Sequence, residues 1–235
     1  MELPGPLKNL LRGGRGGSAP NLPPAAGGSV RSLFASRHGA EESIATRQSR
    51  GLEEFFKYIR DQSGLTVLDL GGATQQNVSF ITNLGHRLYS ENFLQILAET
   101  FGPDDTVDQS NPGRIEYFLK QSLDYPEGHF DGVLIWDVLE YLAPPLLVAV
   151  VERLNKIVRP KSYMLAFFHS DDKQDAVPAY TFRIQELNKL QVAQHGMHHP
   201  AQLFNNRSLE KLFGKFESVK FFLTRERLRE VIIKV

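Results

Sequence analysis

The stretch Thr66-Val-Leu-Asp-Leu-Gly-Gly-Ala73 decides the fold class of this chain. Its apolar run ending in Asp69 is typical of a buried parallel strand, and Gly71-Gly72 allow a tight turn at which backbone can approach a ligand closely. About 20 residues further on, Glu91 ends a second predicted strand, where a carboxylate can accept hydrogen bonds from both hydroxyls of a ribose. The spacing therefore indicates a nucleoside-type cofactor.

Helical and strand patterns alternate on both sides of this stretch. Helices are predicted from 52 to near 63 and over 76–84, 93–101, 144–158 and 208–213. Strands are predicted over 66–70, 86–90, 114–119, 130–136, 162–168, 219–224 and 228–235. This alternation predicts an α/β, Rossmann-like, doubly wound fold with a mostly parallel seven-stranded sheet and an antiparallel C-terminal strand pair.

Two segments do not follow this alternation of helices and strands. Residues 1–49 are rich in Gly and Pro and hold few large apolar residues, so we expect a disordered N-terminal tail before a domain spanning 50–235. The segment 169–207 has only weak strand character at 180–184 and 190–193. Since α/β scaffolds vary their specificity through loops, we expect 169–207 to be an insertion on the substrate side.

Composition narrows the function classes. The 235 residues hold 27 Lys+Arg and 27 Asp+Glu, so no net charge draws the chain to nucleic acid or to an anionic membrane. There is no cysteine, which removes disulfides and thiolate sites, and no apolar run approaches the roughly 18 residues that span a bilayer. We expect a cytoplasmic protein with a small-molecule substrate and neither nucleic acid nor membrane as partner; the oligomeric state is not indicated.

The ordered motifs resemble those of the class I S-adenosylmethionine-dependent methyltransferases over residues 50 to 235. The resemblance is carried by Val67-Leu-Asp-Leu-Gly-Gly72, by Glu91, and above all by Phe130-Asp-Gly-Val-Leu-Ile-Trp-Asp-Val-Leu-Glu-Tyr-Leu142. It implies S-adenosylmethionine as the cofactor and a methyltransferase activity. The cofactor-binding residues it implies are Asp69, Gly71, Gly72, Ala73, Glu91, Asn92, Gln121, Ser122, Trp136 and Asp137.

The residues that carry the chemistry are less defined. Asp137, Tyr141 and His169 are candidates for a general base, which is needed only if the acceptor is protonated. Trp136 is interpreted equally well as a core residue. The cluster His195-Gly-Met-His-His199 is a weak metal candidate, because Gly196 and Pro200 disfavour a helix and no acid lies nearby.

Two other function classes stay open. The family pattern places glycines where Ala73 and Gln75 stand, so a methyltransferase-like binding or scaffold protein without activity is the alternative. An NAD-dependent oxidoreductase is the third reading. Pyrophosphate binding requires a G-x-G-x-x-G turn, and the segment from Gly71 to Gln76 does not have that spacing.

Overall fold

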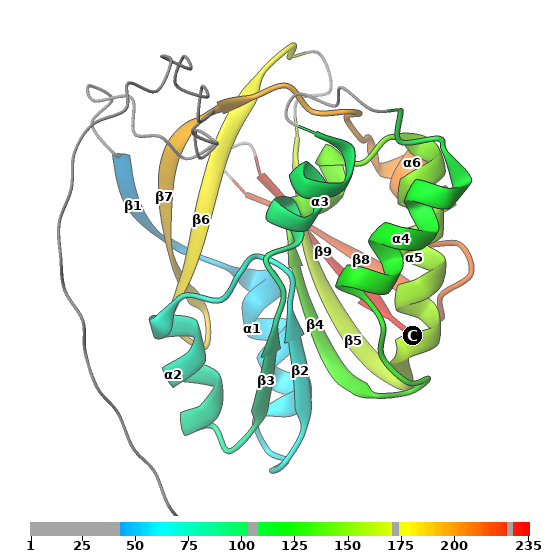
Figure 1. The fold of residues 1–235 in the computed structure, drawn as a ribbon. Coiled ribbons are helices and arrows are strands. Elements are labelled where there is room, and N and C mark those ends of the chain that lie inside the picture. Colours follow the sequence, from blue (N-terminus) through cyan, green and yellow to red (C-terminus); the bar gives the residue numbers. More distant parts are fainter. Residues whose placement is uncertain (1–42, 103–107, 171–173, 225–227) are drawn as a thin grey trace, which may run out of the picture. The chain divides into compact units, whose positions relative to one another are not determined.

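The central sheet has six strands in the order β3-β2-β4-β5-β9-β8 (Figure 1). The computed structural model describes residues 43–102, 108–170, 174–224 and 228–235. The strands are β2 (Thr66–Asp69), β3 (Arg87–Ser90), β4 (Phe130–Trp136), β5 (Val158–His169), β8 (Ser218–Leu223) and β9 (Leu228–Lys234). β3, β2, β4 and β5 are parallel, whereas β9 is antiparallel to both β5 and β8. The predicted mostly parallel sheet with an antiparallel C-terminal pair is confirmed.

The strand predicted at 114–119 is wrong, because this segment belongs to a helix, α4 (Pro112–Ser122). Asn111 caps the start of the helix with a side-chain hydrogen bond. Ile115 and Phe118 both pack against the core at helical spacing. Within the described residues the central sheet therefore has six strands rather than the predicted seven.

Different layers cover the two faces of the central sheet (Figure 1). One face packs on α3 (Phe93–Phe101), α4, α5 (Pro144–Ile157) and α6 (Asn206–Leu212), and the other on α1 (Arg50–Ile59), α2 (Gln75–Asn83) and a second sheet. β4 shows the division within one strand, because Val133 and Ile135 enter the first core whereas Leu134 and Trp136 enter the second. Such coverage of both faces is the doubly wound arrangement that the sequence predicts.

The second sheet, called the small sheet below, has three antiparallel strands in the order β1-β7-β6. They are β1 (Ser43–Gln48), β6 (Val177–Glu186) and β7 (Lys189–His198). β6 and β7 form a hairpin within the segment 169–207, longer than its weak strand character predicts. The hairpin packs on α1 and the central sheet through Phe182, Ile184, Leu190 and Val192.

β1 corrects the predicted boundary of the N-terminal tail. Residues 43–48 pair with β7 instead of belonging to a tail that runs to 49. Their side chains are mostly exposed, so no hydrophobic pattern marks the strand in the sequence. Arg47 is the buried exception and forms an ion pair with Glu230 of β9 at 3.1 Å. The remainder of the predicted tail, 1–42, lies outside the described residues.

Candidate active site

The turn after β2 is built around the buried carboxylate of Asp69. Its Oδ1 accepts hydrogen bonds from the backbone N–H of Gly71 and from the indole N–H of Trp136, both at 2.8 Å. Its Oδ2 accepts one from the side-chain amide of Asn77 at 3.5 Å. Burial raises the pKa of Asp69, and these hydrogen bonds oppose the rise. Asp69 therefore shapes the turn from inside and would act on a cofactor through the backbone that it holds.

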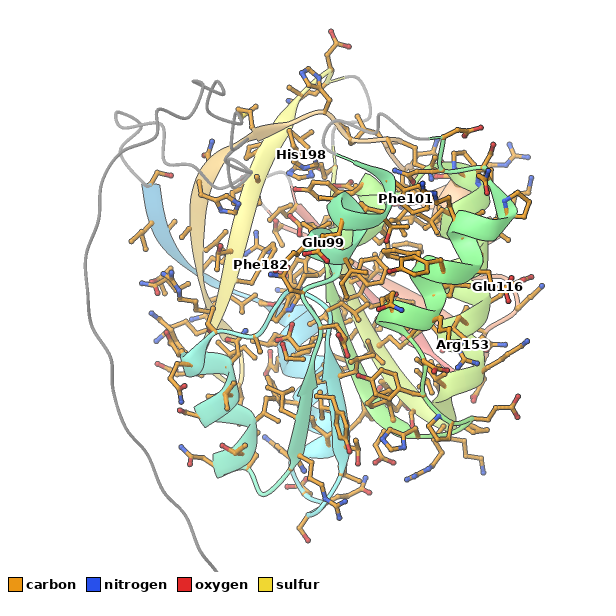
Figure 2. All side chains as sticks on the ribbon, in the orientation of Figure 1. Glu99, Phe101, Glu116, Arg153, Phe182 and His198 are labelled. Carbon is orange, nitrogen blue, oxygen red and sulfur yellow. The ribbon has the colours of Figure 1, made fainter. Side chains whose placement is uncertain are left out.

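Trp136 forms one wall of this turn. It ends β4 with a left-handed φ of 57°, and its indole stacks on Phe167 at 5.8 Å and on Phe182 of the small sheet at 5.1 Å between ring centroids. Phe182 is labelled in Figure 2. A Cβ on Gly71 would lie 2.6 Å from the Trp136 ring, so only glycine fits at that position. Trp136 is thus a core residue that also lies against the turn, whereas Gly71 itself remains exposed to solvent.

Backbone contacts join the residues that follow β2 to those that follow β3. The backbone N–H of Gly72 donates to the carbonyl of Glu91 at 3.0 Å, and Gly71 and Asn92 form an isolated β-bridge. Gly72 has a φ of 70°, a conformation that favours glycine. The next N–H along the chain, that of Ala73, donates to a serine hydroxyl at the end of β3. Together with Asp69 and Trp136, the structure therefore brings five further predicted residues to this turn: Gly71, Gly72, Ala73, Glu91 and Asn92.

A tyrosine that the sequence analysis missed holds the carboxylate of Glu91. The hydroxyl of Tyr125 donates to Oε1 of Glu91, and burial together with this contact raises the pKa of Tyr125. Oε2 of Glu91 has no hydrogen-bond partner in the described part of the chain, which leaves it available to ligand hydroxyl groups. Tyr125 lies in the loop between α4 and β4, where no motif marks it in the sequence.

Gln121 and Ser122 lie in the last turn of α4 instead of following a strand. Gln121 is exposed, and the buried hydroxyl of Ser122 donates to the carbonyl of Phe118 at 2.8 Å. In the described residues no hydrogen bond joins either side chain to the turn at Gly71. Their predicted place depended on a strand at 114–119, which the helix replaces.

A second group of polar side chains lies just after β4 and at the end of β5. Asp137 follows Trp136 directly, Glu140 lies in a 3-10 helix (Val138–Tyr141), and His169 ends β5. Oε1 of Glu140 accepts the backbone N–H of His169 at 2.8 Å, and Oε2 lies 2.6 Å from Nδ1 of the same residue. Both side chains are buried. The carboxylate therefore orients the imidazole so that Nε2 faces away from Glu140.

The small sheet contributes His198 to this group. Its ring stacks on that of Tyr141 at 3.9 Å and lies 6.2 Å from that of His169, measured between centroids. Burial lowers the pKa of His198 to about 4, and burial raises the pKa of Tyr141. His198 lies on β7 and not in a loop, and among the described residues no group of three or more His, Cys, Asp or Glu side chains is placed so that it could hold a metal ion. Figure 2 labels His198.

Several buried polar atoms of this group have no hydrogen-bond partner among the described residues. They are Oδ2 of Asp137, Nε2 of His169 and both ring nitrogens of His198. Burial, followed by the negative charge of Glu140, raises the pKa of Asp137 to about 7. An unpaired buried polar atom costs about 1–3 kcal/mol, and perturbed groups of this kind concentrate at functional sites. The polar edge cluster is the name used below for Asp137, Glu140, Tyr141, His169 and His198.

The turn and the polar edge cluster both lie at the carboxyl ends of the parallel strands, where open α/β sheets bind ligands. The residues of the turn fit S-adenosylmethionine. The backbone at Gly71 is exposed, and Glu91 offers Oε2 to the ribose hydroxyls. The cofactor carries no phosphate, so a G-x-G-x-x-G turn is not needed.

The family described as a methyltransferase domain matches residues 38–217 of this chain. No curated protein sequence matches it. Similar solved structures include the following. An Archaeoglobus fulgidus S-adenosylmethionine-dependent methyltransferase is 15% identical, with TM-score 0.47 and coverage of 78% of this chain and 91% of that chain. A Clostridium acetobutylicum one is 11% identical, with TM-score 0.46 and coverage of 80% and 92%. The Burkholderia thailandensis 1,6-didemethyltoxoflavin-N1-methyltransferase is 14% identical, with TM-score 0.43 and coverage of 78% and 76%.

These structural likenesses are too distant to carry a functional argument. The family match is different, because it spans most of the chain and includes both the glycine turn and the polar edge cluster. The chain therefore belongs to the methyltransferase-domain family, and the resemblance to the class I S-adenosylmethionine-dependent methyltransferases is confirmed.

Proposed function

We propose that the protein transfers the methyl group of S-adenosylmethionine to a small-molecule acceptor bound against the polar edge cluster. One observation carries this proposal. Trp136, which lies against the glycine turn, is followed directly by Asp137, the first residue of the polar edge cluster. A cofactor on the turn and an acceptor on the cluster would therefore be neighbours at one edge of the sheet.

The turn would hold the cofactor through few contacts. Oε2 of Glu91 would accept hydrogen bonds from the ribose hydroxyls, while Tyr125 keeps that carboxylate in place. The exposed backbone at Gly71 and the left-handed Gly72 would allow the rest of the cofactor to approach closely. When bound, the cofactor supplies an activated methyl carbon, so the protein contributes alignment and a dry pocket.

The polar edge cluster would receive the proton of the acceptor. With Nδ1 of His169 donating to Glu140, Nε2 is the basic nitrogen. An acceptor O–H or N–H placed there would lose its proton to Nε2, and the cofactor would supply the methyl group that takes the place of that proton. Aligning nucleophile and methyl group in this way supplies several kcal/mol, about 7–11 in the best intramolecular models.

A small acceptor agrees with the burial of the cluster, since β7 covers it with His198, whose ring stacks on that of Tyr141. The formal net charge of zero gives no support to nucleic acid as a substrate. No helix in the described ranges is long and apolar enough to cross a bilayer. The cytoplasmic location, the lack of a nucleic-acid partner and the tail at 1–42 stay predictions from the sequence.

A binding protein without activity is the second candidate. The packing of Trp136 on Gly71 favours it, because the glycine is required there by the protein's own indole. The family match gives no support to the NAD-dependent alternative.

Mass spectrometry of the purified chain with S-adenosylmethionine and separate phenol, carboxylic acid, amine and thiol acceptors tests the proposal. We expect one acceptor class to gain a methyl group while adenosylhomocysteine forms in equal amount. Tight adenosylhomocysteine binding without methylation of any acceptor, including those of a metabolite extract, would instead support the binding protein.

A further inference from the structure

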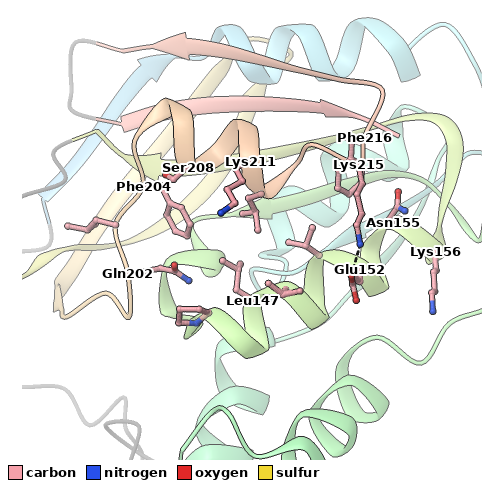
Figure 3. Close-up of a pocket in the computed structure, with 15 residues that line it drawn as sticks. Leu147, Glu152, Asn155, Lys156, Gln202, Phe204, Ser208, Lys211, Lys215 and Phe216 are labelled. Carbon is pink, nitrogen blue, oxygen red and sulfur yellow. Dashed lines mark hydrogen bonds and ion pairs between the residues drawn. The ribbon is translucent and has the colours of Figure 1, made fainter.

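A cavity of about 640 Å³ lies between α5 and α6, lined by neither the glycine turn nor the polar edge cluster (Figure 3). Its volume falls within the range of about 300–1,000 Å³ that is typical of small-molecule sites. One wall is the outer face of α5, and the other consists of the segment 202–216, which includes α6. The cavity is therefore a separate site, built by elements that the proposed methyl transfer does not use.

The floor of the cavity is apolar. Leu147 and Val151 of α5 face Phe204 and Phe216 from the opposite wall. All four belong to the first core and are at most 9% exposed, so their positions are fixed by packing from below. Val148, which also lines the cavity, is 49% exposed. A ligand that lies along this floor must itself be largely apolar.

Charge is concentrated at one end of the cavity. Figure 3 shows Lys156, Lys215, Glu152 and Asn155 together at that end, with Gln202 at the opposite end and Leu147 between them. Lys215 donates to Glu152 at 2.7 Å. Lys156 is the second cation at this end of the cavity. With a further lysine, Lys211, on the α6 wall, the lining carries three lysines and one glutamate. The charged end therefore favours an anion.

We propose that this cavity binds an anionic amphiphile, a single alkyl or acyl chain that ends in a carboxylate or phosphate group. The chain would lie over Leu147 and Phe204, and the head group would contact Lys156 and Lys215. Glu152 would compete with the head group for Lys215, since the two side chains already form an ion pair. A cavity with an apolar floor and cations at one end suits a molecule that has an apolar chain and an anionic group at one end.

Isothermal titration of the full chain with decanoate tests this proposal. Octanoate, decyl maltoside and decyltrimethylammonium serve as the comparison ligands, all below their micellar concentrations. We expect decanoate to bind about tenfold more tightly than octanoate, because each buried methylene contributes up to about fourfold in affinity. The cationic ligand should bind at least tenfold more weakly than decanoate, and added salt should weaken decanoate binding.

Three charge variants identify the site. Lys156→Glu and Lys215→Glu should each weaken decanoate binding about tenfold, whereas Glu152→Gln should tighten it severalfold by removing the competing carboxylate. These side chains are at the surface, so the variants should fold normally. Lys220→Glu on β8, whose side chain is 55% exposed and outside the cavity lining, is the matched control and should bind as the wild type does.

Equal binding of the anionic, neutral and cationic ligands would overturn the proposal, as would decanoate binding that Lys156→Glu and Lys215→Glu leave unchanged. No binding of decanoate at millimolar concentration would overturn it as well. Binding of an acidic amphipathic peptide in place of decanoate would assign the cavity to a protein partner. Adenosylhomocysteine affinity should be the same in all four variants, so the outcome is independent of the proposed methyl transfer.

Discussion

The carboxylate of Glu140 accepts the backbone N–H of His169 at 2.8 Å while its second oxygen lies 2.6 Å from Nδ1 of the same residue. One side chain thus fixes both the end of β5 and the ring that projects from it. The backbone carbonyl of Glu140 also accepts the N–H of Ala201 at 2.8 Å, which attaches the segment after the small sheet to the same point. The orientation of the proposed base therefore depends on a single buried acid.

Replacing this acid should cost stability. Glu140→Ala leaves a buried backbone N–H and Nδ1 of His169 unpaired, so we expect the free energy of unfolding to fall by about 2–5 kcal/mol. Urea unfolding at pH 7 measures the change. Glu116→Ala on the exposed face of α4 is the control and should stay within about 0.5 kcal/mol of the wild type. A loss below 1 kcal/mol in Glu140→Ala would contradict the pairing.

Asp137 should give the protein an unusual pH dependence. Its pKa rises from 3.8 to about 7 on folding, so between these values the folded state holds a proton that the unfolded state releases. Stability contributed by Asp137 is therefore intact below about pH 4 and falls as pH rises to 7, by about 4 kcal/mol in total. The lowered pKa of His198, about 4, has the opposite effect. It makes the folded protein less stable as pH falls below 6.5, the ordinary pKa of histidine.

The comparison with Asp137→Asn isolates the acid, since His198 is present in both proteins. We expect the variant to gain stability relative to the wild type as pH rises from 4 to 8, measured by urea unfolding at each pH. A constant difference across that range would show that Asp137 is ionised in the folded protein.

The contact between Gly71 and Trp136 should appear as an energetic coupling. A Cβ at Gly71 would lie 2.6 Å from the indole, so Gly71→Ala should cost about 1–3 kcal/mol in the wild type. In a Trp136→Leu background the same substitution should cost less than about 0.5 kcal/mol, because the ring is absent. Additive losses in the double-mutant cycle would contradict the packing of the indole on the turn.

The buried ion pair of Arg47 and Glu230 ties β1 to the central sheet. Arg47→Met removes one partner of this buried ion pair, so we expect a loss of about 3–5 kcal/mol in chemical unfolding. Lys220→Met removes the exposed partner of Glu54, a pair at 2.8 Å, and should cost at most about 1 kcal/mol. Equal losses in the two variants would mean that β1 is not anchored through this pair.

The sequence predicts local features of the fold well and those that depend on distant pairing poorly. The strand at 130–136 is confirmed, because a continuous apolar run after a turn has few other readings. The segment 114–119 was assigned to the wrong class, since a short apolar run fits either period and the Asn-Pro start of the helix was the better signal. β1 carries no apolar alternation and forms through backbone pairing with β7.

The same distinction holds for the site. The structure brings Gly71, Gly72 and Glu91 together as the sequence predicts, because their spacing along the chain is itself the signal. The pairing of Glu140 with His169, separated by 29 positions, and the contact of Tyr125 with Glu91 arise only when the strands lie side by side. No periodicity or motif in the sequence encodes such contacts.

Calorimetric titration of adenosylhomocysteine into the wild type, Glu91→Ala and Glu116→Ala tests the central claim most directly. The account predicts saturable binding to the wild type and to Glu116→Ala, and binding at least tenfold weaker to Glu91→Ala, because the ribose hydroxyls lose their acceptor. No binding to the wild type at millimolar ligand, or equal binding to all three proteins, would contradict it.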